Sequence, residues 1–266
     1  MCRWVAYRGQ SIYMEDVVTK PSHSLIHQSM RATEAKSETN GDGFGIGWYS
    51  DRPRPGAYRE LRPAWSDENL KALCEQVRSN LFFAHVRAST GTATSRANCH
   101  PFIDGEHMFM HNGQVGCYTD LRRKIENLIP DQHYGQRFGT TDSEAIFLIA
   151  MARGAAQDPV AAMASTLADI KLMMRDCAVK EPLRFTAAMT NGRDIHAFRW
   201  ACDHKAPSLY WREQDGDLLV VSEPLDDVRD HWMQVPQGCA LVARQGHPVE
   251  IRPFLAEENA AESVMA

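Results

Sequence analysis

The 266-residue sequence predicts an α+β fold of two mainly antiparallel sheets with helices packed outside them. Three observations predict this arrangement. Short segments of strand character occupy the first part of the chain, helical spacing fills most of 118–177, and strands return from 184 to 254. Neither a low-complexity linker nor an internal repeat divides the sequence, so we expect one domain over 2–255 and a frayed C-terminal tail over 256–266.

The first part of the chain is expected to supply strands to a sheet that includes the N-terminus. The expected strands are 3–7, 44–49, 81–86 and 107–110. A helix is expected over 67–77, because Leu70, Leu73 and Val77 fall on one helical face. The last of these strands should end at a turn formed by His111-Asn112-Gly113.

Helices are expected to dominate the middle of the chain, at 118–128, 143–153 and 159–177. Pro159 suits the first turn of the longest one, where the N–H that proline lacks has no intrahelical partner. Asn191-Gly192 favours a hairpin turn between two strands. Strands are expected at 184–190, 195–200, 209–211, 218–222, 239–243 and 249–254.

Charge and cysteine content argue against several classes of function. The formal net charge is -5 and no basic run is present, so no nucleic-acid partner is expected. The seven cysteines lack the paired spacing of a disulfide framework or a zinc site, so we expect a reducing, cytoplasmic location and no bound metal or cofactor. No apolar run approaches the roughly 20 residues that cross a bilayer, so no membrane association is expected.

Cys2 directly follows the initiator methionine, and a small residue at this position permits removal of Met1. Cys2 would then carry both a thiol and a free α-amine, whose ordinary pKa of about 8 lets it accept the thiol proton at neutral pH. A nucleophile and its base would share one residue. Taken alone, however, a second-position cysteine is more often an incidental small residue.

Two further segments bring polar groups to the ends of expected strands. In His111-Asn112-Gly113, the Asn112 amide and the Gly113 N–H could bind an oxyanion side by side, although a plain Asn-Gly turn explains the same residues. Arg87 follows the apolar strand 81–86, where its guanidinium could bind a carboxylate through two hydrogen bonds. A structural ion pair is the alternative for Arg87.

Other segments suggest local packing and capping. Thr141 and Glu144 fit a capping box, which makes Asp142 a first-turn carboxylate that the helix dipole favours, whether or not it also binds a substrate ammonium group. Glycine recurs at 41, 43, 45 and 47, so another backbone could pack closely against one face of that strand. Ser222-Glu223-Pro224 could line the rim of a site or simply end a strand.

Seven motifs are spread in a fixed order over most of the chain. They are Met1-Cys2-Arg3, Asn40-Gly41-Asp42-Gly43-Phe44-Gly45, His85-Val86-Arg87, Asn98-Cys99-His100-Pro101-Phe102, His111-Asn112-Gly113, Thr141-Asp142-Ser143-Glu144 and Ser222-Glu223-Pro224-Leu225. In this order they resemble the class II glutamine amidotransferases of the N-terminal-nucleophile hydrolase superfamily. The combination is far more specific than any one motif.

The resemblance implies a four-layer αββα sandwich with Cys2 at the end of a central strand. It implies that Cys2 attacks the δ-amide carbon of glutamine and that Asn112 and Gly113 form the oxyanion hole. Ammonia would then leave with a proton from the α-amine, and water would hydrolyse a γ-glutamyl thioester.

The resemblance also implies a set of substrate contacts. Arg87 is similar to the residue that holds the substrate α-carboxylate, and Asp142 to the residue that meets the α-ammonium group. His100 and Thr90 are similar to nearby substrate contacts.

The region similar to this family uses nearly the whole chain, which implies a stand-alone amidohydrolase. It is similar to the γ-glutamyl amidohydrolase of ergothioneine synthesis and to glutathione-degrading relatives. Its expected partner is a small molecule, glutamine or a γ-glutamyl amide. Two alternatives stay open: a glutaminase subunit that supplies ammonia to a separate synthase, and a binding protein that kept the fold without chemistry. The oligomeric state is open as well.

Overall fold

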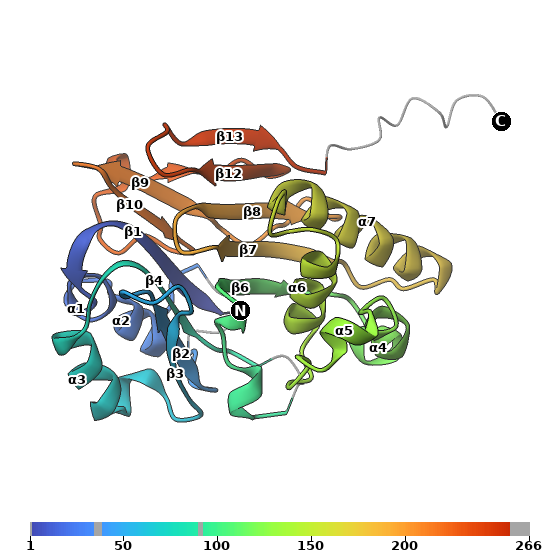
Figure 1. The fold of residues 1–266 in the computed structure, drawn as a ribbon, viewed down its shortest axis with the longest axis horizontal. Helices are drawn as coiled ribbons and strands as arrows, with labels where there is room; N and C mark the ends of the chain where they lie inside the picture. The colour runs from blue at the N-terminus through green and yellow to red at the C-terminus, as the bar shows by residue number, and fades with distance from the viewer. Residues whose placement is uncertain (1, 35–38, 90–92, 256–266) are drawn as a thin grey trace.

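A computed structural model describes residues 2–34, 39–89 and 93–255, and within them two sheets lie face to face between two layers of helices (Figure 1). The strand pairings in both sheets are antiparallel. The predicted α+β class and its αββα layering are therefore confirmed. Among the described helices, none is long and apolar enough to span a membrane. The tail expected over 256–266 lies outside the described residues.

Among the described residues, the first sheet has seven strands with the N-terminal strand near its centre. Its strands are β1 Arg3–Tyr13, β2 Phe44–Trp48, β3 Gly56–Glu60, β4 Arg78–Val86, β9 Tyr210–Gln214, β10 Asp217–Val221 and β11 Met233–Gln234. Their order across the sheet is β11-β9-β10-β1-β4-β2-β3. Because β1 pairs with β10 on one side and β4 on the other, the start of the chain is held inside the sheet.

The second sheet has six strands within the same described ranges. They are β5 Phe102–Asp104, β6 His107–Gln114, β7 Arg184–Thr190, β8 Ile195–Ala201, β12 Cys239–Ala243 and β13 Glu250–Pro253, in the order β13-β12-β8-β7-β6-β5. β7 and β8 form the predicted hairpin. Gly192 in its turn has a φ of 86°, which suits glycine, and the Asn191 side-chain oxygen accepts the N–H groups of Arg193 and Asp194.

Two groups of helices cover the outer faces of the sheets. The first sheet is covered by α1 Glu15–Val18, α2 Leu25–Met30 and α3 Glu68–Gln76. The layer over the second sheet consists of α4 Tyr118–Glu126, α5 Asp131–Tyr134, α6 Asp142–Ala152 and α7 Pro159–Asp176. Single 3-10 turns lie at Ala64–Ser66, Arg96–Asn98 and Arg229–His231.

Alternation along β1 divides its side chains between two cores. Val5 and Tyr7 pack beneath the helices of the first sheet, whereas Trp4 and Ala6 pack between the two sheets. Successive side chains of a strand point to opposite faces. The same alternation puts Cys2, two residues before Trp4, on the inter-sheet side.

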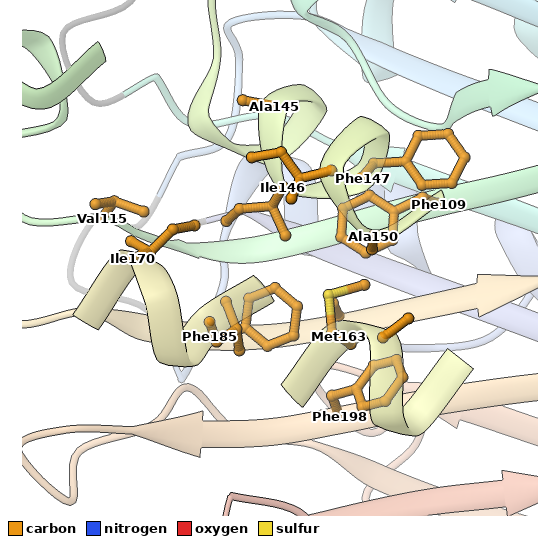
Figure 2. Packing of buried hydrophobic residues seen from close by; sticks show 14 of the residues in the cluster. Phe109, Val115, Ala145, Ile146, Phe147, Ala150, Met163, Ile170, Phe185 and Phe198 are labelled. Carbon is orange, nitrogen blue, oxygen red and sulfur yellow. The ribbon is translucent and has the colours of Figure 1, made fainter. Parts of the chain in front are cut away.

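A large core lies between the second sheet and helices α6 and α7 (Figure 2). Phe109 of β6 and Phe147 of α6 stack there with their ring centroids 5.3 Å apart and their planes 1° from parallel. Each such side chain contributes roughly 1.5–3 kcal/mol on burial. α6 is buried from Ser143 to Ala150, because α7 covers the side that the sheet leaves open. This packing fixes the first residue of α6, Asp142, relative to β6.

Two aspects of the fold differ from the sequence prediction. The turn predicted at His111-Asn112-Gly113 is wrong, because β6 continues to Gln114 and pairs with β7, with Asn112 opposite Thr186 and Gly113 opposite Phe185. The sequence patterns also do not predict β3, β5, β11, α1, α2 or α5. None of these elements is longer than six residues, so they are too short for a hydrophobic period to emerge.

Candidate active site

Cys2 stands directly before β1 and beside the end of β4. Arg3 pairs with Val86, so the register continues to Cys2 beside Arg87. Both β1 and β4 contact β6 of the other sheet, and Figure 1 shows the start of β1 next to β6. The Cys2 side chain is half-buried, and its thiol donates a hydrogen bond of 3.6 Å to the Ala88 carbonyl. Cys2 thus lies at the end of a central strand.

The surroundings of Cys2 act on its thiol in opposite directions. Burial raises the pKa of the Cys2 thiol above its ordinary value, because a buried thiolate loses its hydration. The contact with Ala88 and the positive charges of Arg87 and Arg3 lower the pKa without cancelling the effect of burial. Thiolate formation at neutral pH therefore needs a base close to the sulfur.

Arg87 follows β4 and is only 3% exposed. Its guanidinium donates hydrogen bonds to the carbonyls of Asp42 and Ala93 and to the Ser89 hydroxyl, at 3.3, 3.5 and 3.3 Å. Alternation along β4 puts Arg87 on the same face as Phe83, between the sheets. The guanidinium is therefore held in place on the side of the sheet that Cys2 faces.

The glycines of β2 let the segment at His100 approach the first sheet. A Cβ atom at Gly45 would lie 2.0 Å from the His100 carbonyl oxygen, and one at Gly47 would lie 2.8 Å from Pro101. No larger residue fits at either position without moving that segment. The close packing predicted for the glycine face is confirmed, and the segment that packs against it is His100-Pro101, whose peptide bond is cis.

Two buried histidines meet between the sheets. The rings of His85 and His100 lie with their centroids 4.1 Å apart, and they are 1% and 4% exposed. Their ring nitrogens have no hydrogen-bond partner of normal geometry among the described residues. Burial lowers the pKa of His85 to about 3, although the nearby His111 backbone opposes the shift, and it lowers the pKa of His100 well below its ordinary value. Both rings are therefore neutral at neutral pH.

Asn112 is 1% exposed, and its side-chain amide has no hydrogen-bond partner among the described residues. Alternation along β6 puts it on the same face as Met108 and Met110, toward the first sheet. β5 pairs with β6 only as far as Phe109. Beyond Phe109, β6 pairs with β7 on one edge, and no described strand pairs with its other edge. Successive N–H groups of a strand point to opposite edges, so one of the N–H groups of Asn112 and Gly113 points to the edge without a strand.

Hydrogen bonds between α6 and the residues on either side of Asn112-Gly113 hold this part of the chain in place. His111 Nδ1 lies 2.8 Å from the Ser143 hydroxyl, and Asp142 accepts the N–H groups of Val115 and Ser143, each at 2.8 Å. Gly113 allows the strands to come close, because a Cβ atom there would lie 1.9 Å from a carbonyl oxygen of β7. Both Asp142 oxygens thus already accept protein hydrogen bonds, and its contact with a substrate ammonium group stays a prediction.

Sequence comparison assigns the chain to a family. The model of the family described as glutamine amidotransferases class-II matches residues 13–210, which is more than half of the chain. The chain belongs to the class-II glutamine amidotransferases. The resemblance inferred from the motifs is confirmed, as is the expected enzyme class, which acts on an amide C–N bond.

Two curated relatives match nearly the whole chain. The probable glutamine amidotransferase DUG3 of Saccharomyces cerevisiae is 31% identical over 303 residues, which cover 94% of this chain and 84% of the yeast protein. The gamma-glutamyl-hercynylcysteine sulfoxide hydrolase of Mycolicibacterium smegmatis is 26% identical over 251 residues, which cover 94% of this chain and 98% of that protein.

Solved structures share the fold. A glutamine aminotransferase class-II domain protein from Silicibacter pomeroyi matches with a TM-score of 0.76 and 36% identity, and the match covers 96% of this chain and 100% of that one. The glutamine phosphoribosylpyrophosphate amidotransferase of Bacillus subtilis matches with a TM-score of 0.65 and 14% identity. That match covers 96% of this chain but 50% of the other, and it shows a common fold alone.

The start of α6 fits the predicted capping box only in part. Thr141 Oγ1 accepts the Glu144 N–H at 3.2 Å, as predicted. The Glu144 carboxylate does not return to Thr141: it pairs with Arg137 at 2.5 Å and accepts the N–H groups of Phe138 and Gly139. A buried carboxylate is better satisfied by a guanidinium and two N–H groups than by a single N–H group. That half of the prediction is wrong.

Sequence reasoning gave His85 and Ser143 only as members of motifs, without a role. It also did not find the position of Glu223. His85 precedes Arg87 by two residues, so strand alternation could have placed it on the site face. Glu223 is not at a rim: it is 1% exposed and pairs with Arg3, a contact without a local sequence signal. Thr90 lies outside the described residues. Among the described His, Cys, Asp and Glu side chains, no three are grouped to hold a metal ion.

Proposed function

We propose that this chain is a stand-alone amidohydrolase that cleaves the side-chain amide of glutamine or of a γ-glutamyl compound, with Cys2 as its nucleophile. The observation that supports the proposal is that Cys2, Arg87 and Asn112 all lie on the inter-sheet side, at or beside the contacting strands β1, β4 and β6. The two curated relatives support it, because one is named as a glutamine amidotransferase and the other as a hydrolase of a γ-glutamyl compound.

The chemistry begins once Met1 has been removed. The Cys2 α-amine takes the thiol proton, and the thiolate sulfur forms a bond to the δ-carbonyl carbon of the substrate. The carbonyl π electrons move to oxygen, where the Asn112 amide and the Gly113 N–H stabilise the negative charge. As the C–N bond breaks, the α-amine returns the proton to the departing ammonia or amine. Water then attacks the γ-glutamyl thioester and restores the thiol.

Substrate binding is assigned to charged and polar groups around the nucleophile. Arg87 would hold the α-carboxylate through two parallel hydrogen bonds, and Asp142 would meet the α-ammonium group. His100 would contact the rest of the γ-glutamyl group. Thr90, three positions after Arg87 in the sequence, would do the same. The neutral state of His100 supports a hydrogen-bonding role rather than a second positive charge beside Arg87.

The purified protein alone, assayed for release of ammonia or amine from glutamine, glutathione and other γ-glutamyl amides, tests this function. We expect turnover of at least one substrate, and in Cys2→Ala a loss of at least about 10³-fold with an unchanged melting temperature. Cys239→Ala is the matched control, because Cys239 is also a half-buried free cysteine. Persistent turnover in Cys2→Ala would refute the nucleophile. Turnover that appears only after addition of a synthase would favour the ammonia-supplying subunit, and none in either case would favour a binding protein.

A further inference from the structure

We propose that Arg3 and Glu223 are positioning residues for the nucleophile: their buried ion pair holds the carbonyl of Cys2 and thereby the direction of its thiol and amine. The inference rests on the proposed function of Cys2. It concerns the face of β1 opposite to the site, where neither side chain can touch the substrate.

Glu223 is the centre of a densely bonded cluster beneath the first sheet. Its Oε2 atom lies 2.9 Å from Arg3 Nε and accepts the Glu34 N–H at 3.1 Å. Its Oε1 atom accepts the N–H and the hydroxyl of Thr33 at 2.9 and 2.6 Å and pairs with His23 Nε2 at 2.5 Å. Burial acts to raise the pKa of Glu223, but the hydrogen bonds from His23 and Thr33 and the charge of Arg3 outweigh it and lower the pKa to about 2.

Arg3 joins this cluster to the nucleophile. Its side chain is fully buried, and its terminal nitrogen Nη1 donates a hydrogen bond of 3.1 Å to the Cys2 carbonyl. The direction of that carbonyl is set by one backbone torsion of Cys2, so holding it limits how the thiol and the amine can turn. Ser222 fixes the next peptide as well, because its hydroxyl accepts the Trp4 N–H at 2.9 Å.

Stability alone is a weak reason for such a pair. The cost of removing two charges from water offsets most of their attraction, so buried ion pairs often add little to folding. Glu223 also has donors from His23, Thr33 and Glu34 that would keep its charge satisfied without Arg3. We infer that Glu223 holds the Arg3 guanidinium in place, and that the guanidinium in turn holds the backbone carbonyl of Cys2.

The test compares Glu223→Gln and Arg3→Met with Glu250→Gln, which removes a carboxylate from the half-exposed Arg252–Glu250 pair on β13. Three quantities are measured: kcat and KM with the best γ-glutamyl substrate, the melting temperature, and the rate of alkylation by iodoacetamide, followed at Cys2 by peptide mass mapping. We expect kcat and the alkylation rate to fall at least about tenfold in the first two variants while KM stays within about twofold, since a misdirected nucleophile slows chemistry without changing substrate contacts. Glu250→Gln should match the wild type.

The outcomes separate positioning from structure. A folded Glu223→Gln protein with wild-type kcat and alkylation rate overturns the proposal. If that variant does not fold, Arg3→Met decides, with slow alkylation in support and unchanged alkylation against. Failure of both variants to fold makes the pair purely structural and also overturns it. Alkylation needs no substrate, so a wild-type protein that hydrolyses no γ-glutamyl compound would refute the proposed function and still leave the positioning role open to this test.

Discussion

The first sheet carries buried polar groups on both faces at the start of β1, and the Glu223 carboxylate on the helix side is bonded differently from the amide and imidazole groups on the inter-sheet side. On the helix side, both oxygens of Glu223 are occupied by protein donors. On the inter-sheet side, the side chains of Asn112 and His100 have no hydrogen-bond partner among the described residues, and His85 has none of normal geometry. Leaving a buried polar group without a partner costs about 1–3 kcal/mol. We therefore expect a ligand to complete the hydrogen bonds on the inter-sheet side, and the helix side to support the site from behind.

The largest effect on activity is expected from a comparison of two fully buried asparagines, one on the inter-sheet side and one bonded within the chain. Asn98 bonds Ala93 and Thr140 through three hydrogen bonds, whereas the Asn112 amide bonds nothing in the described chain. We expect Asn112→Leu to lower kcat by about 10²–10³-fold, the usual loss of an oxyanion donor, with little change in stability. Asn98→Leu should instead lower the free energy of unfolding by about 2–4 kcal/mol.

Steady-state kinetics of both asparagine variants measure kcat, and urea unfolding measures their free energy of unfolding. If Asn112→Leu lost as much stability as Asn98→Leu, the Asn112 amide would belong to the framework, and the contrast between the two faces would fail.

Acid unfolding sharpens the comparison, because the two faces titrate in different ranges. The pKa of His85 is about 3 in the folded protein against an ordinary 6.5, so the unfolded chain binds the proton first. The contribution of neutral His85 to the free energy of unfolding is therefore complete above pH 6.5 and is lost as pH falls toward 3. The pKa of Glu223 is lowered from 4.5 to about 2, so its contribution is present above pH 4.5 and is lost as pH falls toward 2.

The inter-sheet side should thus weaken first on acidification. We expect His85→Phe to reduce the loss of unfolding free energy between about pH 7 and pH 4.5 by on the order of 2 kcal/mol, while other buried histidines contribute equally to both proteins. Urea unfolding at the two pH values measures the difference. An identical pH slope in wild type and variant would mean that His85 is not held neutral.

A smaller effect on activity is expected at Arg87. Its guanidinium donates hydrogen bonds to protein groups, and in the proposed function it also binds the substrate α-carboxylate. In Arg87→Lys the charge stays, but a single ammonium group cannot reproduce two parallel hydrogen bonds. We expect KM to rise about tenfold and kcat to change less, since the contact is made in both the bound and the reacting substrate. An unchanged KM would exclude the carboxylate role.

Sequence patterns predicted the fold where the cause is local. The strand pattern over 3–7 marks the start of β1, and Pro159 marks the first turn of α7. The glycine face of β2 was also evident, because it depends only on the absence of side chains at 45 and 47. These features carry enough information within one segment to be found without the rest of the chain.

The patterns fail where a distant segment decides. Asn112-Gly113 is typical of a turn, and only pairing with β7 makes it part of a strand. Glu144 was assigned to the Thr141 cap, but Arg137 lies closer to its charge once the loop has folded. Glu223 follows β10, far along the chain from Arg3, and β10 must pair with β1 before the two residues can meet.

The most direct test of the central claim is the intact mass of the mature protein before and after treatment with a glutamine-analogue electrophile. We expect a mass without Met1 and, after treatment, a single adduct that maps to Cys2. In a mature protein that retains Met1, the Cys2 amine is part of a peptide bond and cannot act as the base. That result, or an adduct on another cysteine, would refute Cys2 as an N-terminal nucleophile.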